Sequence, residues 1–212
     1  IDPTLVGNDM RMLVSDMAGR ASIELKGREL GFDLTGKPEL LTRVVDRVKN
    51  AEAQGYTFDA ADASFTLMLR EELDGARPAY FAVESWRASV NYSAKEGGDG
   101  ESEATVKLHA GGARVVQTGE GNGPVNALDH ALREALIGVY PEIETFELID
   151  FRVRLLDTSH GTDAATRVLI QTTDGAEVWS TVGVGPNILE AAYEALVDSL
   201  VYGLLSHGTE VR

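Results

Sequence analysis

Hydrophobic positions along the chain follow two different periods, and the change comes near Pro78. Before this residue, apolar side chains recur at helical spacing. The clearest stripe consists of Leu40, Leu41, Val44, Val45 and Val48. After it, apolar and polar positions alternate, which is typical of strands. We therefore expect an α+β chain, with a helical linker subdomain over residues 1–77 and a second, β-rich domain over 78–212.

The helical part predicts four short helices separated by glycines. Asn8 can cap the first, which should end near Gly19. The second is expected over residues 21–30. The third should begin at Pro38, since a proline in the first turn sacrifices no helical hydrogen bond. Asp59 can cap the fourth.

The β-rich part predicts the same order of elements twice. The first set of strands is expected over 81–90, 105–109 and 113–118, with a helix from Pro124. The second set is expected over 146–156, 166–172 and 176–182, with a helix over 187–204. The charged, glycine-rich stretch 95–103 is expected to be a solvated turn, and a change of phase after Ser85 indicates a bulge. We expect two βββα units, over 78–141 and 142–212, whose apolar faces pack together because one helix covers only one face of a sheet.

Both helix entrances of these units are rich in glycine. Gly119-Glu120-Gly121-Asn122-Gly123-Pro124 opens the first helix, and Gly183-Val184-Gly185-Pro186 opens the second 64 residues later. Free N–H groups and the helix dipole at such an entrance favour an anion, for instance a small carboxylate. Glycines that only form tight sheet-to-helix turns are the alternative. A nucleotide site is disfavoured, since the first loop reads G-x-G-x-G and lacks the G-K-[ST] of a P-loop.

Composition excludes several classes of function. The chain has 19 Lys and Arg and 34 Asp and Glu, which gives a net charge of −15. This charge disfavours nucleic acid and anionic membranes as partners. The chain has no cysteine, which excludes disulfides and sulfur metal ligands and is compatible with the cytoplasm, the expected location. No apolar run reaches the ~18 residues of a membrane span. The four histidines and the serines form no catalytic, metal or cofactor pattern, and a start at Ile1 without methionine fits a fragment.

Residues 119–128, set within the doubled βββα module, resemble the C-terminal regulatory domain of the 2-isopropylmalate synthase and citramalate synthase family. The N-terminal part resembles the helical region that follows the catalytic barrel in that family. Ile1-Asp2-Pro3, Val6-Gly7-Asn8 and Leu13-Val14-Ser15 look most like the citramalate-type branch. The resemblance covers essentially the whole chain.

The resemblance implies a parent acyltransferase that condenses acetyl-CoA with a 2-oxo acid in a TIM barrel containing a divalent metal. The barrel is absent from this chain, which is therefore expected to have no catalytic residue and no cofactor of its own. The chain would be the regulatory part of an (R)-citramalate synthase in isoleucine biosynthesis. Two alternatives stay open: a leucine-sensing 2-isopropylmalate synthase domain, and a dimerisation module without a ligand.

The resemblance also implies a homodimer that binds a branched-chain amino acid as feedback inhibitor. Carried over by position, the effector pocket would be lined by Val125, Asn126, Leu148, Phe151, Leu155, Thr162, Thr166, Pro186 and Ile188. Family members often have Tyr-Asp-Ala where this chain has Val125-Asn126-Ala127. The missing carboxylate removes a charged partner for the effector's ammonium, so weak feedback is a further open alternative.

Overall fold

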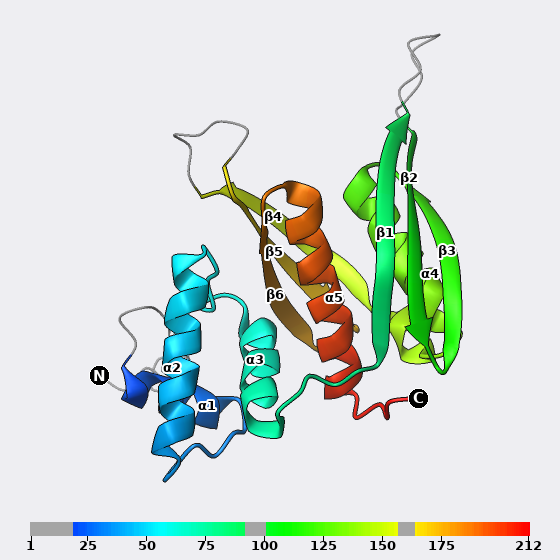
Figure 1. Cartoon of the computed structure of the whole chain (residues 1–212). Helices are drawn as coiled ribbons and strands as arrows, with labels where there is room; N and C mark the ends of the chain where they lie inside the picture. Colours follow the sequence, from blue (N-terminus) through cyan, green and yellow to red (C-terminus); the bar gives the residue numbers. More distant parts are fainter. Residues whose placement is uncertain (1–18, 92–100, 157–163) are drawn as a thin grey trace.

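The computed structural model describes residues 19–91, 101–156 and 164–212, and it confirms an α+β architecture (Figure 1). Three helices come first: α1 (Arg20–Glu29), α2 (Pro38–Ala53) and α3 (Asp62–Asp74). We call them the helical segment. Two three-stranded sheets follow, each succeeded by one long helix. The helix predicted after Asn8 lies outside the described residues.

Three of the predicted helices lie within the described residues of this segment, and one predicted start is wrong. α1 agrees with the helix predicted over 21–30 to within one residue at each end. α2 begins at Pro38 as predicted, and it buries the apolar residues Leu40, Leu41, Val44 and Val48. α3 begins after Ala61, and no described side chain caps this end, so the cap predicted at Asp59 is wrong. Phe58 and Ala61 are buried, and Ala61 N donates to Phe58 O at 3.2 Å. Burial of these two residues therefore sets the turn into α3 and outweighs the capping preference of Asp59.

Both sheets are antiparallel, and the middle strand of the three is in the centre of each. The first contains β1 (Phe81–Asn91), β2 (Glu101–Ala110) and β3 (Ala113–Gly121). The second contains β4 (Glu147–Leu155), β5 (Thr166–Thr173) and β6 (Val178–Gly185). The strand order is the predicted one in both units.

β2 and β3 both extend beyond their predicted bounds, β3 by continuing to Gly121 where an end at residue 118 was expected. β2 already begins at Glu101, so the solvated turn expected over 95–103 is wrong for its last three residues, and residues 95–100 lie outside the described part. Ser102 is buried and pairs with both Val90 and Gly121, while Glu101 and Glu103 face solvent. Because the inward-facing residue is a polar serine, this part of the strand lacks the alternation of apolar and polar residues by which strands are predicted.

One helix covers each sheet. α4 (Pro124–Ile137) packs on β2 and β3, and α5 (Ile188–Ser206) packs on β5 and β6 (Figure 1). The two helices also contact each other, so apolar residues of both units form one continuous core. A short 3₁₀ helix, η2 (Pro141–Thr145), precedes β4. Over the described ranges, no helix is long and apolar enough to cross a membrane.

The duplication extends to strand register. β1 changes register between Val83 and Ser85, and β4 does so between Leu148 and Asp150, which confirms the predicted irregularity and shows its repeat. Trp86 pairs with Val106 in the first sheet. Phe151 pairs with Ile170 in the second. Trp86 and Phe151 are therefore structural counterparts.

Two strand glycines let the helices lie directly on their sheets. A Cβ built on Gly119 would be 2.4 Å from Ala131 N, and one built on Gly183 would be 2.1 Å from Ala191 O. Both are helix backbone atoms, which cannot move aside like a flexible side chain. These glycines lie within β3 and β6 and make room for α4 and α5. Their identity follows from close packing of backbone on backbone.

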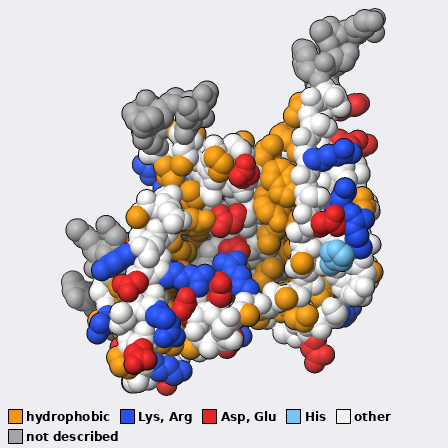
Figure 2. Space-filling model, in the orientation of Figure 1, with side chains coloured by type: hydrophobic (Ala, Val, Ile, Leu, Met, Phe, Trp, Pro, Cys, Tyr) orange, Lys and Arg blue, Asp and Glu red, His pale blue; other side chains and the backbone are white. Residues whose placement is uncertain are grey.

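The helical segment is attached to the second unit through α3, which packs on β6 and α5. Arg77 Nη1 donates to buried Asp198 on α5 at 2.5 Å, and Ser64 Oγ donates to the same carboxylate at 3.0 Å. Tyr56 donates to Glu194, also on α5, at 2.6 Å. Burial raises the pKa of Asp198 above its usual value, although Arg77 and Ser64 oppose this. Figure 2 shows basic and acidic side chains together in the hollow between this segment and the first sheet.

Replacing Gly183 by alanine should destabilise the fold by about 2 kcal/mol or more, because the new methyl group would overlap α5 backbone. Urea unfolding measures this loss. Gly138→Ala is the matched control: Gly138 has a helical φ of −68°, and a Cβ there meets no atom within 4 Å. Equal stability of the Gly183→Ala and Gly138→Ala variants would contradict the backbone contact.

Candidate functional site

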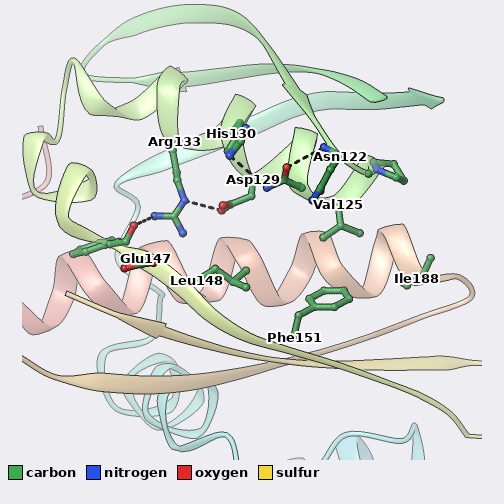
Figure 3. A pocket seen from close by; sticks show the side chains of 13 residues that line it. Asn122, Val125, Asp129, His130, Arg133, Glu147, Leu148, Phe151 and Ile188 are labelled. Carbon is green, nitrogen blue, oxygen red and sulfur yellow. Dashed lines mark hydrogen bonds and ion pairs between the residues drawn. The ribbon is translucent and has the colours of Figure 1, made fainter. Parts of the chain in front are cut away.

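A cavity of about 600 Å³ lies between the two βββα units (Figure 3). Its walls come from the entrance and first turns of α4, from β4 with the residue before it, and from the first residue of α5. The lining residues are Asn122, Gly123, Pro124, Val125, Asn126, Asp129, His130, Arg133, Phe146, Glu147, Leu148, Phe151 and Ile188. This volume is in the range of small-molecule sites.

One side of the cavity is apolar. Leu148 and Phe151 extend from β4, facing Val125 of α4 and Ile188 of α5 (Figure 3). Residues three apart normally point to opposite faces of a strand. The register change after Leu148 adds one residue, so Leu148 and Phe151 both lie on the face that packs towards the helices. The repeated bulge therefore builds the apolar wall.

The other side carries a pair of opposite charges. Arg133 Nε donates to Asp129 Oδ1 at 2.8 Å across one turn of α4. Arg133 Nη1 also donates to the carbonyl oxygen of Phe146, which joins α4 of the first unit to the start of β4 in the second. Asp129 is only 7% exposed. A largely buried carboxylate and a guanidinium therefore border the cavity opposite its apolar wall.

The α4 entrance borders the same cavity. Within the described part of the chain, no side chain caps the first turn of α4, which follows Gly123. At the corresponding position of α5, Asn187 accepts from Leu189 N and Glu190 N at 3.0 Å each. The first N–H groups of a helix have no partner within the helix. Those of Val125 and Asn126 are thus available at the cavity wall.

Asn126 itself is engaged in local hydrogen bonds. Its Oδ1 accepts from Asn122 N at 3.2 Å. His130 Nδ1 lies 2.7 Å from Glu120 O and must donate, since a carbonyl only accepts. His130 Nε2 then accepts from Asn126 Nδ2 at 3.3 Å. Both the oxygen and the nitrogen of the Asn126 side chain are therefore hydrogen-bonded at the α4 entrance.

The structure brings part of the predicted site together. Val125, Asn126, Leu148, Phe151, Ile188 and Gly123 line the cavity. Leu155 and Thr166 do not: they pair with each other at the ends of β4 and β5, and Thr166 is buried. Pro186 precedes the lining residue Ile188 but does not line the cavity, and Thr162 lies outside the described residues. Effector binding by each of these residues stays a prediction.

The remaining predicted glycines, Gly119, Gly121, Gly183 and Gly185, face helix backbone. A Cβ on Gly121 would be 2.7 Å from Ala127 N, and one on Gly185 would be 2.9 Å from Ala191 N. The sequence alone is compatible with glycines that bind an anion and with glycines that only form tight turns. The structure gives these four a packing role, while Gly123, with no atom within 4 Å of a built Cβ, stands at the cavity.

Sequence reasoning missed the polar side of the cavity. Asp129, His130 and Arg133 line the cavity, and none of them was among the predicted site residues. The available signal was their spacing: Asp129 and Arg133, like Asn126 and His130, are four residues apart and can pair along a helix. Among the residues that the structure describes, no group of three or more His, Asp and Glu could hold a metal ion.

Fold and cavity define a duplicated βββα domain with a small-molecule-sized space between its halves. Residues 59–204 match the family model described as the LeuA allosteric (dimerisation) domain. The chain belongs to this family, which confirms the resemblance inferred from the sequence. The match includes α3, which the sequence analysis placed in the linker subdomain, and the boundary at residue 77 stays a prediction.

Curated relatives carry a common name. The chain is 59% identical over 208 residues to an (R)-citramalate synthase of Streptomyces coelicolor, with 98% of this chain and 39% of the relative covered. It is 42% identical over 212 residues to one from Aquifex aeolicus, with 99% and 39% covered. It is 41% identical over 206 residues to one from Synechocystis, with 96% and 38% covered. The chain thus spans about two fifths of the length of these relatives.

Proposed function

We propose that this chain is the regulatory and dimerising part of an acetyl-CoA-dependent citramalate synthase, and that the cavity binds a branched-chain amino acid as feedback inhibitor. The observation that carries the proposal is the composition of the cavity. It combines an uncapped helix entrance, a carboxylate paired with a guanidinium, and an apolar wall. Relatives named (R)-citramalate synthase support the choice of parent enzyme, an acyltransferase.

Each part of a branched-chain amino acid has a matching group. The α-carboxylate would accept from the N–H groups of Val125 and Asn126 at the α4 entrance. The aliphatic side chain would pack on Leu148 and Phe151. The ammonium would bind Asp129, which would be shared between it and Arg133. All three contacts lie on walls of one cavity.

Asp129 offers a carboxylate in place of the one that family members often have at the position of Asn126. Both residues line the cavity, and Asp129 follows Asn126 by three positions, so the two lie on the same face of α4. A carboxylate is thus still present one turn further along the helix. We propose that Asp129 supplies the charge-assisted bond that Asn126, held by Asn122 and His130, does not supply.

Dimerisation is proposed from the inner face of β4. Val153 and Leu155 pair with Val168 and Thr166, which are buried, yet they are themselves 43% and 50% exposed. They continue the apolar row of Phe151 beyond the part of the sheet that the helices cover. A second copy of this chain placed on this row would bury it and narrow the mouth of the cavity. The family description, an allosteric (dimerisation) domain, supports the formation of a dimer.

Isothermal titration with isoleucine, leucine and valine tests the sensor function. We expect saturable heat with at least one, strongest with isoleucine for a citramalate synthase and with leucine for a 2-isopropylmalate synthase. Asp129→Asn should weaken binding about tenfold or more, since a hydrogen bond to a charged group contributes about 1.5–3 kcal/mol. Glu134→Gln, on the solvent side of α4 where Glu134 accepts from Gln117, is the matched control.

Two results would contradict this proposal. No heat and no thermal shift with any of the three amino acids at millimolar concentration would leave only the ligand-free dimerisation module. Unchanged affinity in a folded Asp129→Asn variant would show that Asp129 does not bind the ammonium, although the pocket still binds the amino acid.

Sedimentation equilibrium tests the dimer. The wild type should be a dimer at micromolar concentration, and Leu155→Asp should dissociate it, because the new carboxylate would be buried against the apolar row of the second copy. Arg154→Asp adds a carboxylate to the opposite face of the same strand and should leave the dimer intact. A monomeric wild type, or equal dissociation by both variants, would refute the proposed interface.

A further inference from the structure

We propose that the groove between β1 and α5 is a second copy of the effector pocket that has been closed, so that each chain offers one amino acid site. This inference rests on the proposed function of the open pocket. It starts from the duplication, because two similar units related by a repeat should build two similar grooves, one from α4 with β4 and one from α5 with β1.

Strand residues of the two grooves correspond by register. Trp86 takes the position of Phe151, since their partners Val106 and Ile170 are 64 residues apart and occupy equivalent central strands. Val83 takes the position of Leu148, because each is the last residue before the register change in its strand. An apolar wall is therefore present in both grooves.

Helix residues correspond through the glycine contacts. Gly119 contacts the backbone of Ala131, and Gly183 contacts that of Ala195. Equivalent positions of α4 and α5 are therefore 64 residues apart in the sequence. At this spacing, the counterparts of Gly123, Asn126, Asp129 and Arg133 are Asn187, Glu190, Tyr193 and Val197. Each of the four pairs differs in size, charge or hydrogen-bonding capacity.

Two aromatic rings occupy the space in the second groove. The rings of Trp86 and Tyr193 stack with their centroids 5.3 Å apart and an interplanar angle of 30°. Both side chains pack against the common core. Their counterparts Phe151 and Asp129 border open space instead. Figure 2 shows the apolar side chains collected along β1 on the side of α5.

The hydrogen-bonding groups of the second groove are also occupied. Asn187 accepts from Leu189 N and Glu190 N, the helix-entrance donors that a ligand carboxylate would need. Asn187 Nδ2 in turn donates to Glu190 Oε1 at 2.8 Å, which places a carboxylate at this entrance. That charge would repel a ligand carboxylate. Val197 removes the guanidinium that Arg133 supplies in the open pocket.

Three changes of different chemistry therefore each disfavour amino acid binding in the second groove. One fills the volume, one occupies the N–H donors, and one removes the ion pair. Any one of them would weaken amino acid binding, and together they restrict it to the groove between α4 and β4. The duplication alone would give two amino acid sites per chain. The side chains of the second groove close it, so one site per chain remains.

Binding stoichiometry tests the inference on the wild-type chain. Equilibrium dialysis with labelled isoleucine or leucine should give one bound molecule per chain at saturation. Two molecules per chain would overturn the inference while leaving the proposed function intact. No binding by the wild type would instead contradict the proposed function, so the two failures are distinguishable.

A transplant of the open pocket tests the residues. The variant Trp86→Phe, Asn187→Gly, Glu190→Asn, Tyr193→Asp, Val197→Arg exchanges five residues of the second groove for their counterparts in the first. It should bind two molecules per chain. A folded variant that still binds one would overturn the assignment of these residues.

The reverse exchange provides a matched control that does not depend on opening a cavity. Gly123→Asn, Asp129→Tyr and Phe151→Trp together should close the first groove and reduce binding to none. Retention of one site per chain by this folded variant would show that these residues do not close a groove, and would refute the inference even if the transplant fails to fold.

Discussion

Direct contact between helix backbone and strand glycines fixes how α4 and α5 lie on their sheets. Gly119 and Gly183 let α4 and α5 lie on their sheets without an intervening side chain. The position of α4 in turn sets where its uncapped entrance, Asp129 and Arg133 stand relative to β4. A larger residue at Gly119 would displace the helix and with it one complete wall of the cavity. The glycines therefore act on the site through packing.

Duplication and divergence explain the remaining asymmetry. The repeat supplies two entrances, two bulges and two apolar strand rows. Within the described ranges, the α4 entrance has no side-chain cap, whereas Asn187 caps α5. Tyr56 and Arg77 donate to Glu194 and Asp198 of α5, which joins the helical segment to the second unit. α5 contributes Ile188 to the cavity at its first residue and binds the helical segment through Glu194 and Asp198. An effector that shifts α5 could act on that segment, which requires two states with different effector affinity.

Most of the fold could be predicted from sequence, because the elements carry clear apolar periods and glycine or proline boundaries. Failures came where tertiary burial overrides a local preference, as at Asp59, or where a polar residue faces inward, as at Ser102. The apolar half of the cavity was anticipated through family resemblance. The charged half was not, because Asp129 and Arg133 look like an ordinary solvated i, i+4 pair until β4 is known to cross beside them. No local pattern reports that crossing.

We propose that one cavity between the two units binds a branched-chain amino acid, whose aliphatic side chain lies on the wall formed by β4. Isotope-filtered NOE spectra with ¹³C-labelled isoleucine or leucine test it most directly, since they report which protons lie beside the bound methyl groups. We expect cross-peaks from those methyl groups to the ring protons of Phe151 and none to Trp86. Cross-peaks to Trp86 without any to Phe151 would contradict it.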